Sequence, residues 1–218
     1  MDRIGLKSFF VAAALTLGAV AGLRAAEPEA DPPQGYLLIA AATMPDPRFA
    51  HSVVLLLKHD KEGALGIIIN KPFAERPITA LLDNDAPKNQ PGAKPPDKSP
   101  EKPQDKIDGS IELYFGGPVD LQRGFIVHSA DYHRDETLTI DGDIGVTADR
   151  EILRDIGRGR GPKKYLFAIG YAGWSAGQLE GEIERRDWFS APADPELVFD
   201  ADRAKLWERA LAARSREL

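Results

Sequence analysis

The sequence predicts an α+β fold, and three observations support this prediction. The chain has 218 residues, of which 43% are apolar, so it is long enough to bury a sizeable core. Its β-branched and aliphatic runs are joined by short turns, as strands are in hairpins. The helical patterns stand apart from one another and do not alternate strictly with strands, which favours α+β over a βαβ fold.

The N-terminal half is predicted to be mainly strands. Expected elements are strands over 36–42, 52–60 and 64–72 and a short helix over 76–84. Pro45-Asp46-Pro47 closes the first strand, because proline fixes the backbone and removes an amide donor. The short turn at 61–63 makes the next two strands a hairpin. Pro77 suits the first turn of the helix.

The C-terminal half is predicted to mix both kinds of element. Expected are strands over 110–119, 124–129, 136–140, 163–173 and 195–200 and helices over 148–156, 175–189 and 201–214. Ser175 and Gln178 form a capping-box pattern at one helix start, with Glu182 and Arg186 as an exposed i,i+4 pair. Asp200 is expected to cap the last helix, which turns Leu206, Ala210 and Leu211 toward the core.

The N-terminus has the layout of a secretory signal. Arg3 and Lys7 precede an apolar run over 9–21, and small residues offer cleavage after Ala21 or Ala26. We therefore expect residues 1–26 to be a signal peptide, 27–34 an acidic, proline-rich tether, and 35–218 a single domain. This predicts export, to the periplasm, and no membrane span in the mature chain, since the run is too short. The alternative is a misassigned start and a cytoplasmic protein.

Residues 86–106 differ in amino-acid composition from the rest of the domain. The segment is rich in proline and lysine and has almost no large apolar side chain. Such a composition cannot offset the entropy of ordering, so we expect a disordered insertion. Its alternative role is a proline-rich docking segment for a protein partner.

Charge and composition restrict the functional classes. The formal net charge is -6, which argues against direct nucleic-acid binding outside a local basic patch. The chain has no cysteine, which excludes disulfides, thiolate metal sites and cysteine nucleophiles. We expect no cofactor and no metal, because the clusters HRDE (133–136) and DGDIG (141–145) lack the ligand spacing of a known loop.

Three blocks of sequence resemble a known family. They are LLIAAATMPDPRFAHSVVLLLKHDKEGALGIIINKP (37–72), YFGGPVDLQRGFIVHS (114–129) and GYAGWSAGQLEGEIERRDWF (170–189). In this order they are similar to the YqgE/AlgH family. The resemblance implies a bifurcated, largely antiparallel sheet with a small barrel-like core flanked by helices. It also implies the label of transcriptional regulator, which comes from the genetics of alginate production, and it supplies no catalytic residues. The family is usually leaderless and cytosolic, unlike the N-terminus here.

The stretch from Gly170 to Ile183 allows two interpretations. Glycines before a helix can present backbone N–H groups to an anion, with Trp174 stacking on a ring. Neither nucleotide-binding glycine fingerprint is met, however, and Ser175 and Gln178 are expected to cap the helix. These points favour a packing joint over a ligand cradle.

Other residues are of types that occur in active sites, but their spacing in the sequence does not require them to come together. A hydrolase could combine Ser52 or Ser129 with a histidine and an aspartate, but no nucleophile-elbow motif is present. Asn70-Lys71-Pro72 follows a buried strand and could place an amide and a charge at a cleft. Asparagine before a proline-led turn is equally a routine strand end, so both interpretations stay open. The predicted ligand-binding residues are Asn70, Gly116, Gly117, His128, Gly173, Trp174, Ser175 and Gln178.

These observations predict a non-enzymatic binding or regulatory module. The alternative is a hydrolase or another ligand-processing enzyme, with its site near His128 and the loop over 170–178.

Overall fold

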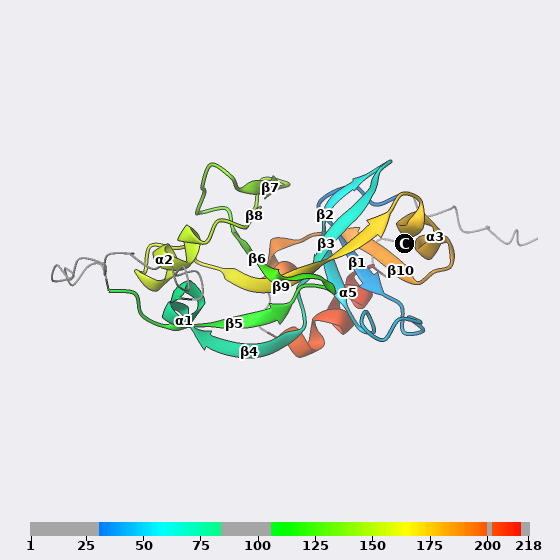
Figure 1. Cartoon of the computed structure of the whole chain (residues 1–218). Coiled ribbons are helices and arrows are strands. Elements are labelled where there is room, and N and C mark those ends of the chain that lie inside the picture. Colours follow the sequence, from blue (N-terminus) through cyan, green and yellow to red (C-terminus); the bar gives the residue numbers. More distant parts are fainter. Residues whose placement is uncertain (1–30, 84–105, 200–201, 215–218) are drawn as a thin grey trace, which may run out of the picture.

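The computed structural model describes residues 31–83, 106–199 and 202–214 (Figure 1). In chain order the elements are β1 (Tyr36–Ala40), β2 (Val53–Asp60), β3 (Gly63–Ile68), β4 (Pro72–Pro77), α1 (Ile78–Asp83), β5 (Ser110–Phe115), β6 (Val119–Ser129), β7 (Leu138–Ile140), β8 (Ile144–Thr147), α2 (Glu151–Gly157), β9 (Tyr165–Ser175), α3 (Gln178–Glu184), β10 (Trp188–Pro192), α4 (Pro195–Val198), the 3-10 turn η2 (Arg203–Lys205) and α5 (Leu206–Arg214).

The long strand β9 divides the sheet into two branches. Its first half pairs with β5 in parallel and with β6 in antiparallel fashion, whereas residues 172–175 pair with β3. The main path runs β10-β1-β2-β3-β9-β6-β8-β7, with β4 added outside β5. Figure 1 shows β9 crossing most of the molecule. Except for β5–β9, these pairings are antiparallel, so the predicted α+β class and the bifurcated sheet are confirmed.

Glycines make the branch point of the sheet. The Gly116 N–H donates to the Ile169 carbonyl at 2.8 Å, and its carbonyl accepts from the Ile68 N–H at 2.8 Å. A Cβ added at Gly116 would lie 2.3 Å from the Gly170 oxygen, and one at Gly117 would lie 2.1 Å from the Tyr171 backbone. Only residues without a side chain allow these backbones to approach so closely.

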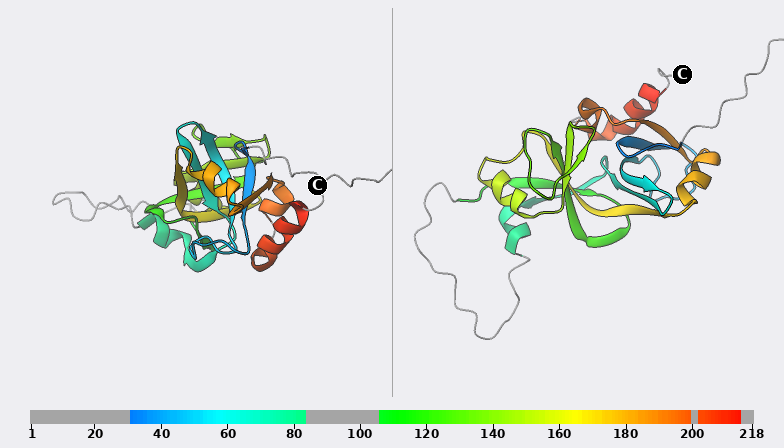
Figure 2. Two further views of the ribbon diagram at one scale, coloured as in Figure 1. Left: turned by 90° about the vertical axis from the view of Figure 1, so that its right-hand side faces the viewer. Right: turned by 90° about the horizontal axis from the view of Figure 1, so that it is seen from above.

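The strands curl into a half-barrel (Figure 2). Apolar clusters lie on both of its faces. Alternate residues of β1–β3 point to opposite faces: Leu37 and Leu55 join one cluster, and Leu38 and Leu56 join the other. This explains why these strands are continuous apolar runs without a polar face.

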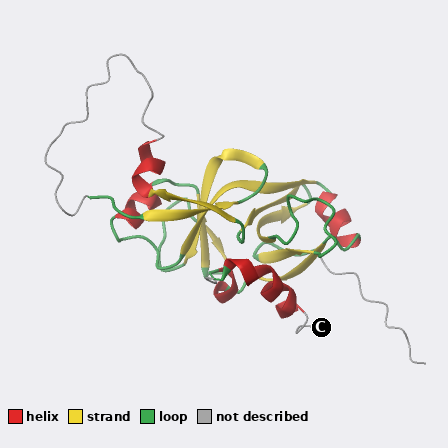
Figure 3. Ribbon diagram, turned by 90° about the horizontal axis from the view of Figure 1, so that it is seen from below, coloured by secondary structure: helices red, strands yellow, loops and turns green. Residues whose placement is uncertain are grey.

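Helices cover the outside of the strands at both ends and along one side (Figure 3). Leu206 and Ala210 of α5 complete the first cluster, as predicted, and Leu179 and Ile183 of α3 complete the second. A third cluster joins α1 and α2 to β5, β6 and β9.

The last predicted strand is wrong. Residues 195–198 form α4, because Pro195 stands in the first turn and the Asp194 side chain accepts the Glu196 N–H at 2.8 Å. The final strand is β10, over Trp188–Pro192, which pairs with β1. Strands β4 and β8 were also not predicted, and Pro77 ends β4 where it was expected to open a helix.

Several expectations concern residues outside the described part. These are the signal peptide at 1–26, most of the insertion at 86–106, and the cap at Asp200. Within the described ranges, no helix has the length and apolarity needed to cross a bilayer.

Candidate functional site

The stretch from Gly170 to Ile183 forms a packed joint around Trp174. This indole is 6% exposed and lies beside Phe49 and Trp188, with ring centroids 6.3 and 5.9 Å away. The Glu182 Oε2 accepts from the indole N–H groups of Trp174 at 2.9 Å and Trp188 at 2.8 Å. The predicted exposed pair of Glu182 with Arg186 is therefore wrong, since α3 ends at Glu184 and Arg186 has a left-handed backbone.

The predicted capping box is formed only in part. Gln178 Oε1 accepts the Ser175 N–H at 3.1 Å, which is one half of the box. The helix starts later than expected, at Gln178, and its cap residue is Gly177 in the left-handed region, without a side-chain cap. The Gln178 amide nitrogen donates to Glu182 Oε1 at 3.0 Å. The Ser175 N–H and both polar atoms of the Gln178 side chain are thus used within the joint.

His128 lies in the interior. It is fully buried, and its Nδ1 is 3.0 Å from the Ser129 carbonyl oxygen. Burial lowers the pKa of the imidazole, so the neutral form is favoured. The ring packs against Gly145, where an added Cβ would lie 2.3 Å from it. Of the described polar groups, none is a hydrogen-bond partner of Nε2.

The structure separates His128 from the end of the loop over 170–178, the two parts of the site expected for a hydrolase. His128 pairs with Tyr165 at the start of β9, while Ser175 ends that strand. Ten residues of extended chain separate these positions, which is about 33 Å in an ideal strand. The Ser129 hydroxyl donates to Asp131. Ser52 is fully buried, and its hydroxyl lacks a hydrogen-bond partner in the described structure.

Asn70 acts on the backbone and also borders a cavity. Its Oδ1 accepts the Val53 N–H at 2.9 Å, and its Nδ2 donates to the His51 carbonyl at 2.8 Å. His51 has φ of 55°, which is unusual for a residue with a side chain. Asn70 thus fixes a strained loop at the cavity wall. Gly116 and Gly117 serve the branch point, and Gly173 is exposed with ordinary contacts.

Two cavities meet at Arg203, which the sequence did not single out. The first has about 480 Å³ and lies between β5, the start of β9, Phe199 and Arg203. The second has about 330 Å³ and is lined by His51, Asn70, Lys71, Arg203, Ala204, Trp207 and Glu208. Arg203 and Trp207 are four positions apart, which places them on one side of the η2–α5 segment. This spacing is the sequence signal that could have indicated that the two side chains lie together.

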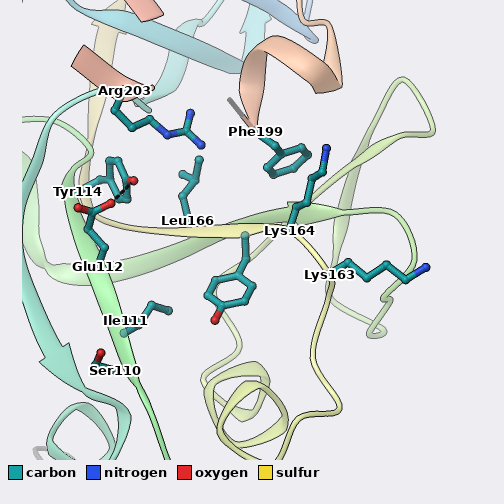
Figure 4. Close-up of a pocket in the computed structure, with 10 residues that line it drawn as sticks. Ser110, Ile111, Glu112, Tyr114, Lys163, Lys164, Leu166, Phe199 and Arg203 are labelled. Atoms are coloured by element: carbon teal, nitrogen blue, oxygen red, sulfur yellow. Dashed lines mark hydrogen bonds between the residues drawn. The ribbon is translucent and has the colours of Figure 1, made fainter. Parts of the chain in front are cut away.

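The Arg203 guanidinium is half-buried at the shared wall. Its Nη1 donates to the Val198 carbonyl at 2.6 Å, and its Cζ lies 5.7 Å from the centre of the Tyr114 ring. Burial lowers the pKa of Arg203, partly offset by Tyr114 and Glu112. Among the described residues, no carboxylate forms an ion pair with it. In Figure 4, Arg203 extends over Tyr114 toward Phe199.

Further polar groups surround Arg203 in the first cavity. Burial raises the pKa of Tyr114 to about 12, helped by a hydrogen bond from its hydroxyl to Glu112. The phenol therefore stays neutral at physiological pH. Figure 4 shows Lys164 rising beside Phe199, whereas Lys163 points away from Arg203.

Lys71 contributes a cation to the second cavity. Its Nζ donates to the Arg48 carbonyl at 2.7 Å, and burial lowers the pKa of its ammonium, with Asp46 opposing. With Arg203, Lys163 and Lys164, four cationic residues line the two cavities, against the carboxylates of Glu112 and Glu208. The described residues contain no group of three or more His, Cys, Asp or Glu suited to a metal ion. The arrangement suits a small anion.

Comparison with known proteins places the chain in a family. A family model described as AlgH-like matches residues 37–217. A UPF0301 protein of Jannaschia sp. (strain CCS1) is 46% identical over 180 residues, which cover 81% of this chain and 85% of that protein. A UPF0301 protein of Methylobacterium sp. (strain 4-46) is 44% identical over 181 residues, covering 82% of each.

Solved structures agree with this assignment. The solution structure of AlgH from Pseudomonas aeruginosa is 34% identical, with a TM-score of 0.63, and the match covers 84% of this chain and 88% of that one. A Corynebacterium diphtheriae protein, 24% identical with a TM-score of 0.59, has a similar fold. The chain therefore belongs to the YqgE/AlgH family, as the three sequence blocks indicated.

Proposed function

We propose that the protein is a non-enzymatic binding module that holds a small anion at Arg203. The observation that carries this proposal is a half-buried guanidinium, shared by two cavities and without an ion-pair partner among the described residues. Burying an unpaired charge costs free energy, and an anion would compensate that cost. A guanidinium binds carboxylate or phosphate oxygens through two parallel hydrogen bonds.

The cavity lining favours binding over catalysis. A nucleophile, a base and an orienting acid would have to lie within hydrogen-bond reach of one another. In the first cavity the Tyr114 phenol stays neutral and donates to Glu112, while the Ser110 hydroxyl donates to Glu75. His128 lies outside both cavity linings. The groups around Arg203 thus supply charge and shape for recognition.

Titration with inorganic phosphate, followed by calorimetry and NMR shifts, tests this proposal. We expect Arg203→Gln to weaken binding by about 10- to 100-fold, the value of a charge-assisted hydrogen bond. Arg185→Gln is the matched control, because Arg185 lies at the end of α3 and pairs with Asp187. If neither phosphate nor acetate binds the wild-type protein at millimolar concentration, or if both variants bind equally, the proposal fails.

For a regulatory role, we propose action through a ligand or a protein and not through DNA. The net charge of -6 gives no long-range attraction to phosphate backbones, and four cations in small cavities cannot follow a duplex. Salt-dependent retention on DNA at low ionic strength would contradict this.

For localisation, we propose export to the periplasm, on the signal-like N-terminal sequence. N-terminal sequencing of the mature protein should give Gly22 or Glu27 as its first residue. An intact Met1 on the protein from the cytoplasm would overturn it.

A further inference from the structure

We infer that the anion at Arg203 is joined to a planar ring, which lies in the second cavity against Trp207. This inference rests on the proposed anion site and names its ligand class. Arg203 lines both cavities, whereas Trp207 and Ala204 line only the second. A ligand whose anionic group binds Arg203 can therefore extend past it into the second cavity.

The second cavity has a rigid aromatic wall. The Trp207 indole N–H donates to the Ala40 carbonyl of β1 at 2.7 Å, which fixes the ring. The His51 ring meets it edge-on, with centroids 4.3 Å apart and planes at 68°. Rings held in advance lose little conformational freedom when a ligand binds. Such a wall favours a flat partner, because aromatic pairs stack or pack edge to face.

His51 has a strained backbone conformation. Its φ of 55° is held by the hydrogen bond that its carbonyl accepts from Asn70. Strained residues of this kind cluster at ligand sites, where the surrounding structure over-determines them. This backbone conformation sets the exposed His51 ring beside Trp207, in the lining of the second cavity.

Size and polarity define the ring further. A volume of about 330 Å³ holds about ten waters at ~30 Å³ each, which is enough for a ring of one or two cycles. Lys71 donates one hydrogen bond to Arg48 and keeps two N–H donors for acceptor atoms on such a ring. The class is thus a phosphate or carboxylate attached to a planar ring, such as an aryl phosphate or a nucleoside monophosphate.

The test compares four probes on the full chain by calorimetry: inorganic phosphate, phenyl phosphate, cyclohexyl phosphate and adenosine monophosphate. Stacking on an aromatic side chain should make phenyl phosphate bind at least about tenfold more tightly than inorganic phosphate. Cyclohexyl phosphate, with its puckered ring, should gain less. Tighter binding of adenosine monophosphate than of phenyl phosphate would support a nucleotide, and the reverse order would support a simple aryl anion.

Variants separate the ring from the anion. Trp207→Leu should remove the advantage of phenyl phosphate and leave the affinity for inorganic phosphate unchanged. His51→Asn is a second variant for the case that Trp207→Leu does not fold, since asparagine tolerates positive φ. If inorganic phosphate binds but phenyl phosphate binds no better, or if cyclohexyl phosphate equals phenyl phosphate, this inference falls and the anion site stands. If no probe binds, the proposed function falls, and the inference falls with it.

Discussion

Replacing Glu182 by alanine tests how the joint around α3 is stabilised. The carboxylate accepts hydrogen bonds from the indoles of Trp174 and Trp188 and from the Gln178 amide. Both tryptophans are buried, at 6% and 1% exposed, so their N–H groups would lack partners after the change. At ~1–2 kcal/mol for each orphaned donor, Glu182→Ala should lower the unfolding free energy by about 2–4 kcal/mol.

Urea unfolding, followed by circular dichroism, measures this difference. Glu184→Ala is the matched control, since Glu184 is exposed on the same helix and makes the same change in charge. For a chain of this size, about 2–4 °C per kcal/mol predicts that the melting temperature falls by about 4–16 °C. Glu182→Gln should lie between, because its amide keeps one acceptor oxygen. If Glu182→Ala and Glu184→Ala agree within about 0.5 kcal/mol, the carboxylate does not hold the joint.

Other predictions concern the branch point and the only histidine held by a carboxylate in the described structure. Gly116→Ala should strongly destabilise the fold, because its Cβ would lie 2.3 Å from the Gly170 oxygen. Gly173→Ala should leave the melting temperature nearly unchanged. Equal melting temperatures of the two variants would refute this prediction. Burial opposes charging of His59, but hydrogen bonds to the Pro32 carbonyl at 2.7 Å and Glu180 at 3.1 Å outweigh it and raise its pKa. Its stabilising contribution, measured against His59→Gln, should therefore be complete below pH ~6.5 and shrink as pH rises through the folded-state pKa; a difference that stays constant with pH would exclude this.

Local patterns in the sequence predicted most of the strands, whereas Gly116 and Gly117, which serve the branch point, were predicted as ligand-binding residues. The hairpin of β2 and β3 follows from two apolar runs around a short turn, and the structure has it. The close contact between Gly170 and Gly117 could not be predicted. Gly117 lies in the turn between β5 and β6, and only the sheet topology brings it to β9. The strand expected over 195–200 failed because short apolar runs fit either element, although Asp194 and Pro195 carry a helix-start signal.

The candidate site was predicted only at its edge. Asn70 and the charge of Lys71 were considered for a cleft, and both residues line the second cavity. The Arg203 guanidinium and the Trp207 indole were not among the predicted ligand-binding residues. In the sequence, Arg203 is one basic residue of an amphipathic C-terminal segment. It becomes half-buried only because β5 brings Tyr114 beneath it. The predicted pair of Glu182 with Arg186 failed for a similar reason. An i,i+4 pair requires the helix to continue, and α3 ends at Glu184.

The branching of the sheet explains why a site can form beneath the C-terminal segment. One face of β5 and β9 is covered by α1 and α2 through Ile111, Leu113 and Phe167. The opposite face, with Tyr114 and Leu166, is covered by Phe199 and by α5, which also closes the half-barrel over β1 and β2. A short segment spread over two branches leaves a hollow between them, and Arg203 lies over that hollow. Arg203 donates to the Val198 carbonyl and lies over the Tyr114 ring, but in the described structure it forms no ion pair that would offset the desolvation of its charge. An anionic occupant of the hollow would supply the missing ion-pair partner.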